Sequence, residues 1–351
     1  MTKRVMVLLL LAVIGRLAIA DQIDDYLREQ MAVHKVPGAA LKVIRDGQDI
    51  KTAAYGLANL ELNVPVTPES VFEIGSVTKQ FTAACILLLQ QDAKLSIEDK
   101  ITKYLPGIPE SWSNVTVRHL LSHTSGIKSY TGLDGFALTR HLTQAQFIKA
   151  LSTQSMEFQP GDSWKYSNSG YSLLGYIVEN VSGKGYWQFL RERLLQPVGM
   201  SATTERSPGV IITNRVSGYE QTNHIHINRD YDLTDVFSAG ALASTVGDLA
   251  KWNAALDSDA ILNARSKKVA WAVQRLNNGK VTKYGLGWFI DEVDGHHNIG
   301  HGGSTSGFSA SIQRFPHDHL TIILLTNTDE QIATTLARKI ATFYFSAKKG
   351  S

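Results

Sequence analysis

The chain has 351 residues, of which 43% are hydrophobic, and its 35 basic and 32 acidic residues give a formal net charge of +3. This length and composition predict one large domain or two closely packed lobes. The near balance of charges gives no electrostatic argument for a nucleic-acid partner or an anionic membrane surface. The single cysteine, Cys85, excludes an internal disulfide, and its apolar neighbours predict an inert core position.

The first twenty residues have the pattern of an export signal. A basic start is followed by an apolar stretch at residues 5–14 and by a small-x-small cleavage site at residues 18–20. The apolar stretch is too short to remain as a membrane span. We therefore expect residues 1–20 to be removed and residues 21–351 to be periplasmic or secreted, without a permanent membrane anchor. Removal takes away three basic residues, so 32 remain against 32 acidic ones.

The start of the mature chain predicts a helix followed by an antiparallel hairpin. Residues 23–33 carry apolar side chains at helical spacing, and residues 39–45 and 50–57 have strand patterns separated by Asp46-Gly47, a hairpin turn. The middle of the chain, from residue 77 to about residue 256, is mostly helical in pattern. Its Gly and Pro breaks separate four further predicted helices, at residues 115–121, 144–151, 171–181 and 186–195.

Strand patterns return near the C-terminus, before a closing helix at residues 331–345. The predicted strands are residues 284–291, 297–300, 308–315 and 320–326, with a turn at residues 316–319. Strands at both ends of a chain with helices between them predict an α+β fold in which both termini build one antiparallel sheet flanked by helices.

We expect this single domain, residues 21–351, to have two lobes. An α/β lobe would contain about residues 21–76 and 275–345, and an inserted, mostly helical lobe would contain about residues 77–274. A cleft between two such lobes is a usual place for a functional site.

Ser76-Val77-Thr78-Lys79 is the most informative motif. It follows a strand-like segment and opens a long apolar run, so Ser76 is predicted at a helix N-terminus with Lys79 one turn away on the same face. A serine hydroxyl becomes a good nucleophile only when a neighbouring base takes its proton, and Lys79 is placed to do so. Two other Ser-x-x-Lys matches, beginning at Ser125 and Ser346, lack this context. The alternative is a capping serine followed by a solvated lysine.

Two further motifs follow in the chain. Tyr166-Ser167-Asn168 comes after a Pro-Gly loop and before a predicted helix, and His301-Gly302-Gly303 follows a predicted strand. Small residues beside a strand allow another backbone to approach closely. Taken singly, each motif has an ordinary structural explanation: a half-buried tyrosine, a helix cap and a strand histidine.

In this order, the three motifs resemble those of the serine β-lactamase and penicillin-binding-protein superfamily, which carries Ser-x-x-Lys, Ser/Tyr-x-Asn and Lys/His-x-Gly elements. The Tyr-x-Asn form is similar to the class C β-lactamase branch, with its DD-peptidase, D-aminopeptidase and family VIII esterase relatives. The resemblance extends over most of the mature chain and implies a β-lactamase/transpeptidase-like fold. Three other segments look like the same branch: residues 120–126, 239–245 and 284–288.

The resemblance also implies roles. Ser76 would attack a carbonyl group and form an acyl-enzyme, Lys79 would act as a neutral base, and Tyr166 would share the proton relay. The backbone N–H groups of Ser76 and Ser304 would bind the developing oxyanion. Asn168 would bind the substrate and fix Lys79. The predicted substrate-binding residues are Asn168, His301, Gly302, Gly303 and Ser304.

No cofactor or metal ion is expected, because this chemistry needs neither. His224 and His226 would share a strand face, but no third ligand lies near them in sequence. The expected partner is therefore a small-molecule or peptide substrate.

His301 is a departure from β-lactamases of this branch, which usually carry lysine at this position. A histidine is mostly neutral at pH 7 and holds a substrate carboxylate less well than a fixed cation does. This difference favours an exported serine hydrolase acting on D-amino-acid peptides or related amides. The alternatives are a carboxylesterase for short acyl esters, a class C-like β-lactamase, and a penicillin-binding sensor that is acylated without turnover.

Overall fold

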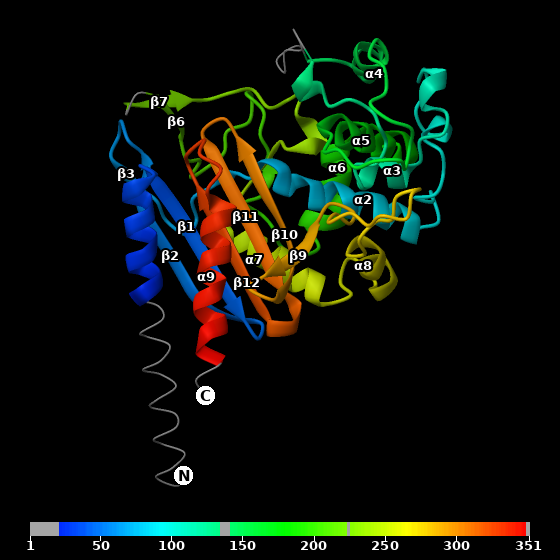
Figure 1. Cartoon of the computed structure of the whole chain (residues 1–351). Helices are drawn as coiled ribbons and strands as arrows, with labels where there is room; N and C mark the ends of the chain where they lie inside the picture. The colour runs from blue at the N-terminus through cyan, green and yellow to red at the C-terminus, as the bar shows by residue number, and fades with distance from the viewer. Residues whose placement is uncertain (1–20, 134–140, 223–224, 349–351) are drawn as a thin grey trace.

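The computed structural model describes residues 21–133, 141–222 and 225–348. The predicted export signal and His224 lie outside the described residues. The described chain is organised around a seven-stranded sheet with helices on both faces (Figure 1). The strand order is β3 (Val64–Pro65), β2 (Gln48–Asn59), β1 (Gly38–Arg45), β12 (Leu320–Thr326), β11 (Phe308–Phe315), β10 (His296–Thr305) and β9 (Phe289–Val293).

The two ends of the chain meet in the middle of this sheet, as predicted. Strand β1 pairs antiparallel with β2 on one side and with β12 on the other, where Leu41 lies opposite Leu324. Leu41 and Leu324 enter one apolar cluster, whereas Ala40 and Leu325 enter the cluster on the opposite face. The two strands are buried on both faces, which explains why they read as almost continuous apolar runs rather than as alternating patterns.

Helices cover both faces of the sheet (Figure 1). The helix at residues 21–33 and α9 (Ala333–Lys348) pack on one face, and their apolar side chains share a cluster with β1 and β12. Helix α7 (Val246–Asp257) packs on β1 and β12 from the other side, where its Trp252 belongs to the larger cluster that continues into the helical part of the molecule.

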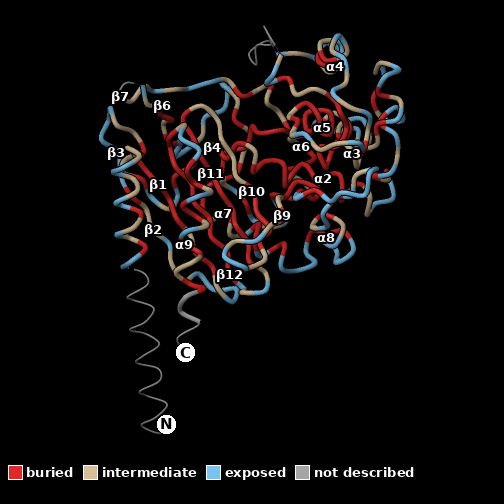
Figure 2. Tube along the Cα trace, in the orientation of Figure 1, coloured by how far each residue is buried: buried red, intermediate tan, exposed pale blue. Residues whose placement is uncertain are grey.

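Helix α2 (Thr78–Gln91) runs through the centre of the helical part, and every residue from Thr78 to Leu89 is buried (Figure 2). A helix that is buried on all sides shows no amphipathic stripe. Around it lie α3 (Val117–Leu121), α4 (Gln144–Ser152), α5 (Asn168–Ser182), α6 (Tyr186–Leu190), a π-helical turn (Arg191–Leu195) and α8 (Ala264–Ala270).

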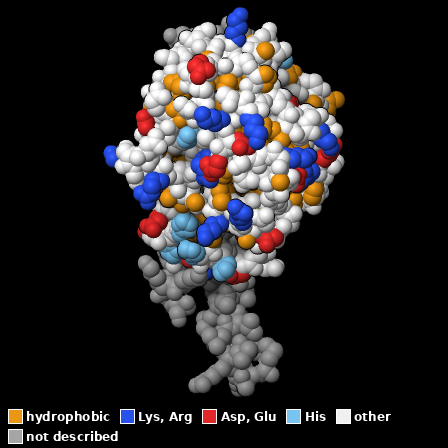
Figure 3. All heavy atoms as spheres, turned by 90° about the vertical axis from the view of Figure 1, so that its right-hand side faces the viewer, with side chains coloured by type: hydrophobic (Ala, Val, Ile, Leu, Met, Phe, Trp, Pro, Cys, Tyr) orange, Lys and Arg blue, Asp and Glu red, His pale blue; other side chains and the backbone are white. Residues whose placement is uncertain are grey.

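The middle of the chain also contains strands, and apart from the strand-like segment before Ser76 and the one around His226, the sequence pattern did not predict them. They form a small sheet of β4 (Phe72–Glu73), β8 (Leu242–Ser244) and β5 (Thr204–Glu205), and a hairpin of β6 (Gly218–Thr222) and β7 (Ile225–Arg229). The face on the helical side carries basic and acidic side chains interspersed (Figure 3). In the part of the chain that the structure describes, no helix combines the length and apolarity needed to cross a membrane.

Two predicted strand boundaries were wrong. The strand predicted at residues 284–291 begins only at Phe289, because Gly287 has a left-handed φ of 85° and the N–H of Gly285 bonds back to the Trp288 carbonyl. The short strand predicted at residues 297–300 continues to Thr305 instead, because β11 pairs with it past its glycines. The His-Gly-Gly motif therefore lies inside β10 and not after it.

Candidate active site

Ser76 lies where the chain passes from β4 into α2. The 3₁₀ turn Gly75–Val77 joins the two elements, and Gly75 adopts a φ of 48°, a conformation that glycine accepts without steric cost. Ser76 is partly exposed, whereas the residues on both sides of it are buried. The turn thus presents one hydroxyl at the surface end of an otherwise buried helix.

Lys79 is fully buried one helical turn further on. Its Nζ lies 3.0 Å from Ser76 Oγ, 2.8 Å from Asn168 Oδ1 and 2.7 Å from the carbonyl oxygen of Ala239. All three neighbours are oxygen atoms that can accept from the Lys79 Nζ, and the Ser76 hydroxyl can instead donate to it when the amine is neutral. The alternative of a solvated lysine is wrong, since this side chain has no access to water.

Burial also lowers the pKa of Lys79. Removal from water penalises an ammonium ion, and this desolvation holds the pKa of Lys79 well below its usual value. Its three hydrogen-bonding neighbours are neutral groups, so no carboxylate bonded to Lys79 opposes this shift. The geometry therefore places the Lys79 amine, with its lowered pKa, directly against the Ser76 hydroxyl, where a serine nucleophile needs a base.

Asn168 is the first residue of α5 and owes its availability to its neighbour. Ser167 is the N-cap, and its hydroxyl accepts from the N–H of Gly170 at 3.3 Å. The suggestion that Asn168 itself caps the helix is therefore wrong. Its side-chain amide is free to hold Lys79, as expected from the sequence.

Tyr166 lies beside Ser76 and Lys79. Lys79 Nζ is 4.8 Å from the centre of the Tyr166 ring, and the ring packs against His123 with a centroid distance of 4.2 Å. Burial raises the pKa of Tyr166, although the nearby Ser76 hydroxyl opposes this rise. The Tyr166 hydroxyl makes no hydrogen bond of normal geometry with any described residue. It is thus a protonated phenol, free to bond to a substrate.

The turn that carries Ser76 and strand β10 touch through two glycines. A Cβ on Gly303 would lie 1.9 Å from the Ile74 carbonyl oxygen and 2.9 Å from Ser76 N, and a Cβ on Gly75 would lie 2.6 Å from Ser304 N. No side chain fits at either position. The close approach brings the backbone of Ser76 next to that of Ser304, the two residues predicted to supply the oxyanion-binding N–H groups.

Replacing Gly303 with alanine is expected to lower kcat by about 10²–10³-fold, the cost of losing one oxyanion donor. The added methyl group pushes β10 away from the Ser76 turn. Gly209→Ala is a matched control, because a Cβ at Gly209 meets nothing within 4 Å. Steady-state kinetics with circular dichroism checks the result. Wild-type turnover in a folded Gly303→Ala protein would show that the contact does not matter.

His301 lies within β10 with its ring buried at 2% exposure. Its Nδ1 is 2.5 Å from the Gly302 carbonyl oxygen and its Nε2 is 2.9 Å from the Tyr284 hydroxyl. A ring protonated only on Nδ1 satisfies both contacts. Burial lowers the pKa of His301 to about 3, so the ring is neutral. Its substrate-binding role stays a prediction, because both ring nitrogens are already engaged.

Three residues near the site were not singled out from the sequence, although their segments were. His123 accepts from the N–H of Ser167 through Nδ1 at 3.1 Å, Ala239 supplies the carbonyl that binds Lys79, and Tyr284 holds His301. They lie in the segments 120–126, 239–245 and 284–288. Residues of these three segments therefore contact the Tyr166, Lys79 and His301 side chains.

A pocket of about 600 Å³ opens onto Ser76 and runs along β10. Its charged lining residues among those described are Asp291 and Arg338, which pair with each other at 2.8 Å. A larger cavity, of about 830 Å³, lies elsewhere and contains none of the predicted site residues. The described residues hold no cluster of three or more His, Cys, Asp or Glu side chains suited to a metal ion. The pocket lining is Ser76, Tyr166, Phe289, Asp291, Gly300, His301, Gly302, Gly303, Ser304, Ser309, Gln313, Gln331, Thr334 and Arg338.

Comparison with known proteins shows which family this chain is similar to. The family model described as Beta-lactamase matches residues 23–344. Penicillin-binding protein 4* of Bacillus subtilis (strain 168) is 30% identical over 322 residues, which cover 85% of this chain and 69% of that protein. The octameric penicillin-binding protein homologue from Pyrococcus abyssi has a TM-score of 0.83 at 27% identity, covering 93% of this chain and 77% of that one. A D-stereospecific amidohydrolase from Streptomyces sp. has a TM-score of 0.74 at 27% identity, covering 86% and 92%.

These similarities extend over nearly all of the described chain and include both the sheet and the helical part. They confirm the predicted superfamily and its α+β fold. The chain belongs to the beta-lactamase family and is a serine hydrolase of that family.

Proposed function

We propose that the protein hydrolyses amides and peptides of D-amino acids through an acyl-enzyme on Ser76. The observation that carries this proposal is the fully buried Lys79 amine, with a pKa lowered by burial, 3.0 Å from Ser76 Oγ. Lys79 takes the Ser76 proton as Ser76 Oγ attacks the substrate carbonyl. The backbone N–H groups of Ser76 and Ser304 stabilise the oxyanion.

Tyr166 completes the proposed cycle. Its protonated phenol donates to the leaving amine, so the C–N bond breaks and the acyl group remains on Ser76. A water molecule then attacks the ester, and its proton moves through the same groups. The acid is released and the Ser76 hydroxyl is restored. The protonated state of Tyr166, maintained by burial, supports its role as the acid.

The charges of the pocket support a substrate without a carboxylate near the reacting bond. Among the described lining residues, the one cation is Arg338, and it is paired with Asp291. His301 is neutral, and burial disfavours the charged form of Lys79. A β-lactam antibiotic or a peptide ending in a free D-alanine brings a carboxylate that this pocket has no unpaired cation to receive. The likeness to a D-stereospecific amidohydrolase supports the amide assignment.

A carboxylesterase is the second candidate, favoured by the same absence of an unpaired cation along the described pocket lining. An ester reacts through the same acyl-enzyme and has a better leaving group than an amide. A β-lactamase and a sensor that is acylated without turnover remain as further outcomes of the test.

Four substrates separate these functions: a D-amino-acid amide, its L-enantiomer, a short-chain nitrophenyl ester and a fluorescent penicillin. We expect turnover of the D-amide with a higher kcat/KM than the L-amide. Turnover of the ester alone would replace the amidase by an esterase. Rapid penicillin hydrolysis would indicate a β-lactamase, and a stable penicillin label without any turnover would indicate a sensor.

We also propose that residues 1–20 direct export and are then removed, on the basis of their basic start, short apolar stretch and small-x-small site. N-terminal sequencing of protein recovered from outside the cytoplasm should then begin at Asp21. Recovery of protein that retains Met1 in the cytoplasm alone would contradict the proposal.

A further inference from the structure

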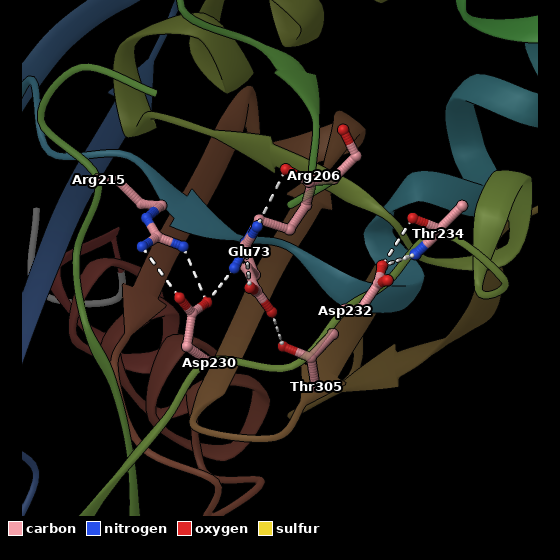
Figure 4. Close-up of polar contacts among 8 residues, drawn as sticks. Glu73, Arg206, Arg215, Asp230, Asp232, Thr234 and Thr305 are labelled. Carbon is pink, nitrogen blue, oxygen red and sulfur yellow. Dashed lines mark hydrogen bonds and ion pairs between the residues drawn. The ribbon is translucent and has the colours of Figure 1, made fainter. Parts of the chain in front are cut away.

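A buried carboxylate lies three residues before the nucleophile. Glu73, on β4, has a side-chain exposure of only 5%. Its Oε2 accepts from the Thr305 hydroxyl at 2.7 Å, and its Oε1 accepts from Arg206 Nε at 3.0 Å (Figure 4). Figure 4 shows that the threonine and the arginine reach the carboxylate from separate segments of the chain. Glu73 thus links β4, the strand before Ser76, to two segments that are distant in the sequence.

Thr305 is the last residue of β10 and follows Ser304 directly. The pairing of β10 with β9 stops at Gly300, so residues 301–305 of β10 pair with β11 alone. The Glu73–Thr305 hydrogen bond holds this end of β10, which pairs with a neighbouring strand on one side only. It joins the strand that carries one oxyanion donor to the segment that carries the other.

Burial raises the pKa of Glu73, and Arg206 opposes this rise by pairing with the carboxylate. The guanidinium is itself buried, with 5% exposure, and it also bonds to Asp230. Asp230 is in turn held by Arg215, through contacts of 2.9 and 3.2 Å (Figure 4). A buried charge persists only when it is paired and hydrogen-bonded. The charges of Arg215, Asp230, Arg206 and Glu73 alternate in sign and each pairs with the next, which meets this condition. Glu73 also accepts from the Thr305 hydroxyl.

Neither Glu73 nor Thr305 lines the substrate pocket. Their side chains therefore have no direct part in binding or in proton transfer. We propose that Glu73 is a positioning residue that acts through Thr305 to fix the separation between the backbone N–H groups of Ser76 and Ser304. This inference rests on the proposed acyl-enzyme mechanism, because the separation matters only when an oxyanion forms between the two groups.

The expected signature is a loss in kcat rather than in KM. Oxyanion donors are aimed at the position that the oxygen takes in the transition state, so a small displacement weakens transition-state binding more than substrate binding. A positional shift of about 1 Å in an active site can cost ~10²-fold in rate. A residue with only a structural role would lower the unfolding midpoint without this selectivity.

The test uses three variants of the full chain. Thr305→Val removes the hydroxyl and keeps the branched shape, whereas Thr305→Ser restores the hydroxyl. Arg215→Gln is the control, since it weakens the exposed end of the charge network and leaves the Thr305–Glu73 bond in place. We expect Thr305→Val to lower kcat by roughly 10- to 100-fold with KM within about threefold. Thr305→Ser and Arg215→Gln should remain within about threefold of the wild type in kcat, far less than the loss of one oxyanion donor.

A boronic acid that forms a tetrahedral adduct on Ser76 provides a second readout. Its inhibition constant should weaken in Thr305→Val by the same factor as kcat/KM and recover in Thr305→Ser. The inference is overturned if Thr305→Val keeps wild-type kcat. It is also overturned if Thr305→Ser fails to rescue, or if kcat falls while boronate affinity does not. Circular dichroism verifies that each variant is folded at the assay temperature.

The rate of Ser76 modification by a fluorophosphonate separates this inference from the proposed function. That rate depends on the oxyanion donors whatever the natural substrate is. If the wild type turns over no amide or ester but reacts with the fluorophosphonate, the substrate assignment fails, and the comparison of Thr305→Val with Thr305→Ser still decides the role of Glu73. If Ser76 of the wild type does not react at all, the mechanism and this inference fail together.

Discussion

Replacing Ser76 with alanine is expected to abolish hydrolysis, with kcat reduced by about 10⁴-fold or more, as for other serine hydrolases that lose their nucleophile. The side chain is partly exposed at the mouth of the pocket, and its Oγ makes a contact with Lys79 that alanine lacks. Because alanine is a good helix former and fits the turn, the variant should fold. Initial rates on the best substrate of the four measure the effect.

Ser125→Ala is the matched control for this result. Ser125 begins a second Ser-x-x-Lys match, and its hydroxyl accepts from the backbone N–H of Ile127 at 3.2 Å instead of facing a lysine amine. We expect this variant to keep its activity to within several-fold, since one neutral hydrogen bond contributes only about 1 kcal/mol to stability. Equal losses in the two variants would mean that the motif at Ser76 has no special role.

Replacing Lys79 with methionine is the second large effect, with an expected loss in kcat/KM of about 10²–10⁴-fold for a missing general base. Methionine has a similar length and fills the buried space without a charge. It loses the hydrogen bonds to Asn168 and Ala239, but it also removes the free-energy cost of holding a lysine neutral in the interior. The unfolding midpoint at pH 7 should therefore not fall. A folded variant with less than a tenfold loss would remove Lys79 from the mechanism.

The pH profile provides an independent test of the same base. Lys79 accepts the Ser76 proton only when it is neutral, so kcat/KM must fall as the pH falls through the Lys79 pKa. Burial lowers this pKa well below the ordinary value of about 10.4. The acid limb should accordingly have its midpoint well below pH 10 and be absent from the residual activity of Lys79→Met. His301, with a pKa of about 3, should add no inflection near the usual histidine value of about 6.5.

The local part of this site could be predicted from the sequence, because short-range geometry determines it. Residues three apart on a helix face the same way, so the Ser76–Lys79 contact follows from the motif once a helix is expected there. Likewise, strand patterns at both ends of the chain predict one antiparallel sheet built from the two termini, although not that β1 pairs with β12. The pKa shifts were less accessible, because the lowered pKa of Lys79 depends on burial by several distant segments.

The long-range contacts could not be predicted from a single sequence. Glu73 and Thr305 are 232 positions apart, and nothing in either local pattern indicates that they bond. The same holds for Gly75 and Ser304, whose close approach is a property of how the sheet meets the nucleophile turn. The sequence pattern predicted Tyr284 in a strand, whereas the structure places it before β9, where its hydroxyl contacts His301. In each case the fold, not the motif, supplies the partner.

The most direct test of the proposed chemistry is the mass of the protein during turnover. Rapid acid quenching of the enzyme with a nitrophenyl ester or a D-amino-acid amide, followed by mass spectrometry of the intact chain and its peptides, should reveal one acyl group on the peptide that contains Ser76. The adduct should be absent from Ser76→Ala. Turnover that proceeds without an adduct on this peptide, or an acyl group that maps to another residue, would contradict the mechanism.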